Sequence, residues 1–155
     1  MSAFIDTGIL LRAVHHADPF YPEVRAAVRQ LISTRIPIFT GLQHFAEFWN
    51  VCTRPPSQRG GFNLSIEETE RRLRRIERGV RLLTDTPLTP EIWKSLVHKH
   101  AVRGVQVHDA RTVALMLTHS LTELVTLNKA DFIRYRSDGI TPITPAELLA
   151  SPSAL

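Results

Sequence analysis

The feature that most constrains the fold is an alternation of short, largely apolar runs with longer segments of helical periodicity. The runs occupy residues 3–6, 36–39, 80–83, 124–127 and 140–143. Between them, hydrophobic residues recur with the 3.6-residue spacing of amphipathic helices. Strands that alternate with helices pair in parallel and are covered on both faces, and Pro142 confines the last run to the border of the sheet. We predict a three-layer α/β/α fold with a central, mostly parallel sheet of four or five strands.

Length and composition favour one ordinary domain. The chain has 155 residues, 43% hydrophobic and 22% charged, which is the profile of a soluble globular protein. We expect a single domain over residues 1–150 and a short tail over residues 151–155. Cys52 is the single cysteine, and the sequence has neither a secretory signal nor the roughly 20 apolar residues of a spanning helix. These features predict a cytoplasmic protein without disulfides or membrane contact.

The charge balance favours a polyanionic partner. The formal net charge is +4, and arginines concentrate on the helix predicted over residues 65–79, where they alternate with glutamates. That pattern has two readings, a solvated face with i,i+4 ion pairs or an edge that contacts phosphates or a partner.

Acidic and amide side chains follow the predicted strands. Asp6 ends the first run, Asp109 follows an apolar stretch at 105–108 that we expect to be a strand, and Asn128 and Asp131 follow the run at 124–127. Glu47 lies on the polar stripe of a helix. Carboxyl ends of parallel strands share one edge of the sheet, where α/β folds bind ligands, so these side chains are expected to converge. Singly, each has another explanation, since the aspartates could cap helices, Asn128 could stabilise a turn and Glu47 could be simple surface.

Convergence of these groups predicts a divalent metal site. Clustered carboxylates repel one another unless a cation neutralises them, and the segments contain no fixed basic residue. Oxygen ligands suit Mg²⁺ or Mn²⁺ rather than zinc, and the four histidines His15, His16, His98 and His100 are expected at the surface. Such an ion activates water for attack on a phosphodiester. No nucleophilic triad is evident, and Cys52 lies on an apolar helix face.

Asp6-Thr7-Gly8 also occurs in aspartic proteases, but that class is almost wholly β, whereas a helical pattern follows here. A phosphatase or phosphoryl-acceptor domain would need a second aspartate where Gly8 stands.

Four segments together resemble PIN-domain ribonucleases, with VapC-type toxins of toxin–antitoxin pairs as the closest likeness. They are Ile5-Asp6-Thr7, the helix segment 43–48 with Glu47, the helix start 108–114 with Asp109, and the segment 126–132 with Asn128 and Asp131. The resemblance covers nearly the whole chain in order and spacing.

The resemblance implies a PIN-like fold and a cytoplasmic endoribonuclease that depends on Mg²⁺ or Mn²⁺. It also implies a homodimer, inhibited by a small antitoxin protein that docks over the acidic cleft. By match, Asp6, Glu47 and Asp109 are metal ligands, and Asn128 stands where many members carry a fourth acid. Asp131 is an accessory carboxylate. With three carboxylates, we expect one tightly bound metal and a second that arrives with the RNA.

A rival reading keeps the PIN-like fold but not the catalysis. In that reading Asn128 weakens the site, and the arginine-rich helix makes the chain an RNA- or protein-binding module. Clustered negative charge has no use in a module that only binds RNA, so we favour the nuclease. In either case RNA specificity is expected to lie in the loop 55–64 and on the arginine face.

Overall fold

The computed structural model describes residues 2–151. Within them, five strands form one sheet in the order β3-β2-β1-β4-β5, and every neighbouring pair is parallel. The strands are β1 (Ala3–Ile5), β2 (Ile38–Gly41), β3 (Arg81–Leu83), β4 (Glu123–Val125) and β5 (Thr141–Ile143). The prediction of a mostly parallel sheet of four or five strands is confirmed, and Pro142 lies on an edge strand as expected.

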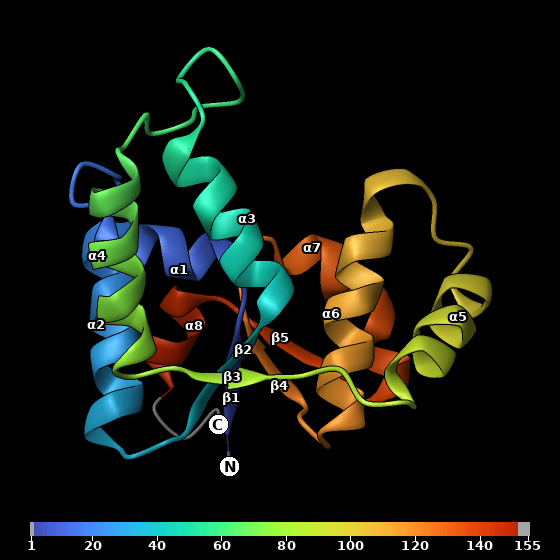
Figure 1. Ribbon diagram of the computed structural model, residues 1–155. Coiled ribbons are helices and arrows are strands. Elements are labelled where there is room, and N and C mark those ends of the chain that lie inside the picture. Colours follow the sequence, from blue (N-terminus) through green and yellow to red (C-terminus); the bar gives the residue numbers. More distant parts are fainter. Residues whose placement is uncertain (1, 152–155) are drawn as a thin grey trace.

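Helices cover both faces of this sheet (Figure 1). In the described part of the chain they are α1 (Thr7–Val14), α2 (Tyr21–Ser33), α3 (Leu42–Thr53), α4 (Ile66–Glu77), α5 (Thr89–Lys99), α6 (Val107–Thr118), α7 (Lys129–Phe132) and α8 (Pro145–Ala150). Two 3₁₀ helices complete the chain, η1 (Gly104–Gln106) and η2 (Ile133–Asp138). None of these helices is both long and apolar enough to span a bilayer.

Alternate residues of the central strands supply two separate cores. Ala3 and Ile5 of β1 pack with α1, α2, α3, α4 and α8, whereas Phe4 packs with α5, α6 and η2. Val125 and Leu124 of β4 divide in the same way, because successive strand side chains point to opposite faces. The predicted three-layer α/β/α arrangement is therefore confirmed.

One expected strand is absent from the described residues. The stretch 105–108 begins in η1 and continues into α6, so Asp109 lies in the first turn of a helix and does not follow a strand. Gly104 turns the chain with a φ of +56°, and Val105 is 77% exposed. Within residues 2–151, Val105 and Val107 have no neighbouring strand with which to form hydrogen bonds, so this stretch does not join the sheet.

Other element boundaries shift by a few residues. β2 begins at Ile38 rather than at 36, and α2 begins at Tyr21 with Pro22, not Pro19, in its first turn. α7 begins at Lys129 rather than at Phe132.

Some side chains also lie differently from expectation. On α3, Leu42 is 64% exposed while His44 and Phe48 are buried. Two of the histidines expected at the surface are packed. His15 stacks on Phe62 at 4.0 Å between ring centroids, and the Nε2 of His100 lies 2.7 Å from the Oδ2 of Asp138.

Candidate active site

Asp6 lies at the junction of β1 and α1. It is the N-cap of α1, and its Oδ1 accepts a hydrogen bond of 3.1 Å from the backbone N–H of Ile9. Its Oδ2 accepts a hydrogen bond from the hydroxyl of Thr126, directly after β4. The side chain is only 8% exposed, and this burial raises the pKa of Asp6 to about 6. The capping explanation is therefore correct for Asp6, and the residue is also a buried carboxylate at the edge of the sheet.

Glu47 reaches the same place from α3. Its Oε2 accepts a hydrogen bond from the hydroxyl of Thr7, in the first turn of α1, and its Oε1 accepts one of 2.8 Å from the Nε2 of Gln43. Both partners are neutral, so the two hydrogen bonds orient the carboxylate without neutralising it.

Asp109, on α6, contributes the third carboxylate of the site. Its pKa is raised to about 6, first by burial and then by the negative charges of Asp131, Asp6 and Glu47. Within the described residues its side chain makes no capping hydrogen bond, and the N-cap position of α6 is Gln106. The capping explanation does not hold for Asp109.

These groups line one small cavity of about 100 Å³. Asp6, Glu47, Asp109 and Asn128 all contribute to its wall, and we call it the acid pocket. The other residues that line it are Thr7, Gly8, Gln43, His44, Thr112 and Phe132. Asp131 is exposed and lies outside the wall, near enough to raise the pKa of Asp109. Since Asp6 follows β1 and Asn128 lies just beyond β4, the acid pocket is at the carboxyl edge of the sheet.

The acid pocket has no ionic partner of its own. In residues 2–151 the ion pairs involve other acids, among them Asp18, Glu68, Asp85, Asp138 and Glu147. No arginine or lysine of these residues forms an ion pair with Asp6, Glu47 or Asp109, although the positive charge of Arg134 partly offsets the rise in the pKa of Asp109.

The donor set fits a hard divalent cation. Carboxylates and an amide supply only oxygen ligands around the acid pocket, as Mg²⁺ and Mn²⁺ prefer. In the described chain no three acidic, histidine or cysteine side chains yet surround a single point closely enough to bind an ion. Oxygens of Asp6 and Glu47 accept hydrogen bonds from Thr126, Thr7 and Gln43, and each carboxylate keeps lone pairs that can bind an ion.

Comparison with known proteins addresses the fold. No protein-family model and no curated protein matches the sequence. Solved structures match over nearly the whole chain. The toxin VapC20 of Mycobacterium tuberculosis, described as cleaving the sarcin–ricin loop, is 17% identical with a TM-score of 0.61, covering 90% of this chain and 97% of that one.

Two further structures show the same similarity. VapBC-1 of nontypeable Haemophilus influenzae is 12% identical with a TM-score of 0.68, covering 94% of this chain and 99% of that one. A toxin–antitoxin complex of Klebsiella pneumoniae is 20% identical with a TM-score of 0.62, covering 93% and 98%. The chain has a PIN-like fold. At these identities the likeness extends to the fold alone.

Several residues in and beside the acid pocket were not predicted as site residues. Thr126, His44 and Thr112 are buried, and the last two line the acid pocket. For Thr126 a signal was available, since a polar residue at the end of a buried strand, two positions before Asn128, needs a buried partner. For His44 and Thr112 the sequence contained no such signal. Both lie on helices, and the sequence does not show which face of each helix is directed toward the acid pocket.

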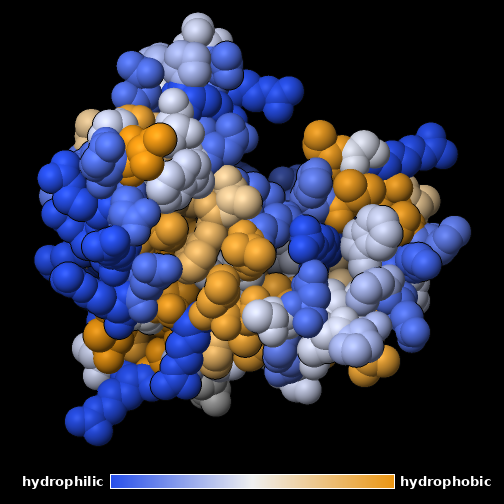
Figure 2. All heavy atoms as spheres, viewed as in Figure 1, coloured by the Kyte–Doolittle hydropathy of each residue, from blue (hydrophilic) through white to orange (hydrophobic). Residues whose placement is uncertain are grey.

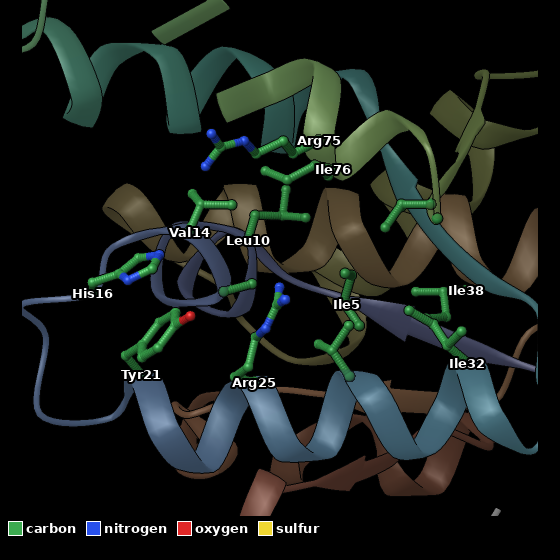
Figure 3. Close-up of a pocket in the computed structure, with 14 residues that line it drawn as sticks. Ile5, Leu10, Val14, His16, Tyr21, Arg25, Ile32, Ile38, Arg75 and Ile76 are labelled. Atoms are coloured by element: carbon green, nitrogen blue, oxygen red, sulfur yellow. The ribbon is translucent and has the colours of Figure 1, made fainter. Parts of the chain in front are cut away.

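A second, larger cavity lies on the other side of α1. It has a volume of about 380 Å³ and lies between α1, α2 and α4, and we call it the α2–α4 groove. Leu10, Val14 and Ile76 are among its apolar residues, and the guanidinium groups of Arg25 and Arg75 reach into it (Figure 3). Figure 2 shows apolar residues exposed beside the hydrophilic surface over α4.

Proposed function

We propose that this PIN-like chain is a Mg²⁺- or Mn²⁺-dependent endoribonuclease. One observation carries the proposal. Carboxylates from three separate segments, Asp6, Glu47 and Asp109, line one pocket without an ion-pair partner in the described chain. The charge of Glu47 raises the pKa of Asp6, and the charges of Asp6 and Glu47 raise the pKa of Asp109. A pocket of this kind is costly to maintain unless it binds a cation. The fold is that of VapC toxins, one of which is described as cleaving an RNA loop.

In this proposal Asp6, Glu47 and Asp109 hold the ion. A bound Mg²⁺ or Mn²⁺ supplies an activated water and stabilises negative charge on the phosphodiester. Thr126 and Thr7 hold the carboxylates of Asp6 and Glu47 through their hydroxyls. Asn128 presents a neutral amide whose N–H can donate to a phosphate oxygen, where a fourth carboxylate would repel it. Asp131 adds negative charge beside Asp109.

The test is cleavage of labelled RNA in the presence of Mg²⁺ or Mn²⁺. Asp6→Asn and Asp109→Asn should each lower the rate by about 100-fold or more, because a metal ion contributes several kcal/mol to the transition state. Asn caps helices as well as Asp does, so Asp6→Asn retains the start of α1. Glu91→Gln, at an exposed position of α5, is the matched control and should cleave normally. Cleavage that survives either active-site change would refute the proposal.

The alternative is a catalytically weak PIN-like module that binds RNA or protein. It is favoured by Asn128 at the pocket wall and by the exposed arginines of α4. Binding of RNA with no metal-dependent cleavage, in the unmodified protein, would select this alternative.

We also propose a small protein antitoxin as partner. It is expected over the acidic cleft, and we propose that it also occupies the α2–α4 groove. The apolar lining fits the hydrophobic face of a polypeptide, and the exposed Arg25 and Arg75 form no ion pair within the described residues. A partner segment with acidic residues flanking its apolar face would match both features. One of the similar structures is a toxin–antitoxin complex. The helix α1 connects the two sites, since Asp6 of the acid pocket is its N-cap and Val14 of the groove is its last residue.

Two further parts of the proposal are a homodimer and a cytoplasmic location. The exposed apolar residues Leu42 and Leu82 line one small cavity between α3, α6 and the edge strand β3. Covering them with a second copy would remove this apolar surface from water.

A further inference from the structure

Two adjacent residues of α3, Gln43 and His44, both reach across to the start of α6. The Nε2 of Gln43 lies 3.3 Å from the carbonyl oxygen of His108, to which it donates. The Nε2 of His44 lies 3.1 Å from the hydroxyl of Thr112. In residues 2–151 these are the side-chain hydrogen bonds that join α3 to α6, and no ion pair joins the two helices.

The hydroxyl of Thr112 has one proton and two neighbours, the carbonyl of His108 at 3.2 Å and the Nε2 of His44 at 3.1 Å. The tautomer of His44 decides whether Nε2 donates to this hydroxyl or accepts from it. Burial lowers the pKa of His44 to about 4, which keeps the ring neutral. His44 is thus an uncharged hydrogen-bond partner of Thr112 beside the acid pocket.

These bonds connect the two helices that carry opposing carboxylates. Glu47 is one turn along α3 from Gln43, which donates to it at 2.8 Å, and Asp109 is next to His108. The charge of Glu47 raises the pKa of Asp109, so the two side chains repel each other. Repulsion would drive α3 and α6 apart, and the bonds from Gln43 and His44 oppose that movement.

Gln43 is also retained at a cost. Its Oε1 is buried and has no hydrogen-bond partner in the described chain. An unpaired buried acceptor destabilises a fold, so an apolar residue would pack here more favourably. A role in the acid pocket accounts for the presence of Gln43.

We propose that Gln43 and His44 are positioning residues that set the spacing between Glu47 and Asp109. This inference rests on the proposed function, because the spacing matters for the ion that those carboxylates would bind. Gln43 acts on both carboxylates, directly on Glu47 and through His108 on Asp109. His44 acts on the same turn of α6 through Thr112.

The test uses variants that conserve side-chain size. Gln43→Met and His44→Leu remove these hydrogen bonds, while His44→Gln keeps a terminal amide that can bond to Thr112 and should rescue. Asn50→Met, at an exposed position of α3, is the control. Isothermal titration calorimetry with Mn²⁺ should give a Kd about 10-fold higher for Gln43→Met and for His44→Leu. His44→Gln and Asn50→Met should match the unmodified protein. In RNA cleavage, kcat should fall while KM stays unchanged.

A second measurement does not depend on metal binding. Hydrogen exchange of the amides of residues 107–112 should be faster in Gln43→Met and His44→Leu than in the unmodified protein, with the control unchanged. If the unmodified protein binds Mn²⁺ and both variants bind it equally well, the positioning role is wrong and the proposed function stands. If the unmodified protein neither binds Mn²⁺ nor cleaves RNA, the proposed function is wrong. Hydrogen exchange then decides the inference alone, and unchanged rates would overturn it.

Discussion

At the scale of single residues, the two aspartates of the acid pocket differ in what holds them. Asp6 accepts two hydrogen bonds, from Ile9 and from Thr126, and it begins a helix. Asp109 has no such partner in the described chain and lies among other negative charges. Replacing Asp109 therefore measures how much the repulsion among the acidic side chains lowers the stability of the fold, with the least disturbance of local structure.

The first prediction concerns the pH dependence of stability. The folded-state pKa of Asp109, about 6, exceeds its ordinary value of 3.8. The protonated form is thus favoured by folding, and its contribution is fully present below pH 3.8 and is lost as the pH rises through 6. Without metal, Asp109→Asn should raise the free energy of unfolding by about 1 kcal/mol at pH 7, after allowing for solvent screening of a half-buried group.

Urea unfolding in EDTA at pH 7 and at pH 4 measures the free energy of unfolding of Asp109→Asn and of the unmodified protein. The difference between them should vanish at pH 4. An opposing effect exists, since a carboxylate in the first turn of a helix is worth about 0.3–1 kcal/mol. If Asp109→Asn lowers the stability at pH 7, the interaction with the α6 dipole outweighs the repulsion.

At the scale of elements, α3 and the segment that follows it form one unit. Residues 55–60 are exposed, as the predicted loop requires, but the next residues fold back on α3. The backbone N–H groups of Phe62 and Leu64 donate to the carbonyls of Val51 and Cys52, at 3.0 and 2.8 Å. Gly61 makes this return possible, because a Cβ there would lie 2.1 Å from the carbonyl oxygen of Arg54.

Gly61→Ala should therefore lower the free energy of unfolding by about 1–3 kcal/mol, the usual cost of overpacking. Gly79→Ala is the matched control. At Gly79 a Cβ would find only Ile32 Cδ1, at 3.8 Å, and the backbone needs no positive φ. Its stability should change by less than about 1 kcal/mol. Thermal or urea denaturation compares the two, and equal stabilities would show that the chain relaxes around Arg54.

The arginines of α4 differ in their surroundings. Arg71 and Arg72 pair with Glu68, and Arg74 pairs with Glu70, as expected for a solvated face. Arg75 instead lines the α2–α4 groove. The charge pattern alone could not show which arginines form ion pairs along the helix and which line the groove, because that depends on the elements that each side chain faces.

At the scale of the whole molecule, metal binding should stabilise the fold. An ion that binds only the folded chain adds about 2.7 kcal/mol at a concentration 100 times its Kd. For a chain of this size, that corresponds to a rise in melting temperature of about 5–10 °C. Differential scanning fluorimetry with and without Mn²⁺ should show the rise in the unmodified protein, whereas Asp109→Asn should lose it. An equal rise in both would place the ion elsewhere.

Self-association should depend on the apolar residues beside α3. Leu42 is 64% exposed and Leu82 is 43% exposed. Light scattering should find a dimer for the unmodified protein and a monomer for Leu42→Glu, because the charge would have to be buried in the interface. Ile133→Glu, at another exposed apolar site, should remain dimeric. A monomeric unmodified protein would contradict the expected dimer.

The amino-acid sequence by itself determined the layers and the edge at which the acidic residues gather. Alternation of apolar runs with helical periodicity is a local property, and parallel strands place their carboxyl ends together whatever the details. Asp6 and Asn128, which lie just beyond strand ends, could therefore be placed from the sequence. Asp109 was expected at the same edge because of a strand at 105–108, which the described part of the chain does not have. The resemblance to known ribonucleases assigned Asp109 and the helix-borne Glu47 their role as metal ligands.

Only the tertiary structure decided which neighbours complete the acid pocket. Thr126 bonds to Asp6 across 120 residues, and His44 bonds to Thr112 across 68. Such pairs depend on how each helix is rotated about its axis, and that rotation is set by core packing against distant strands rather than by local periodicity. The same cause explains why the stretch 105–108 is helical and why α1, α2 and α4 leave a groove between them.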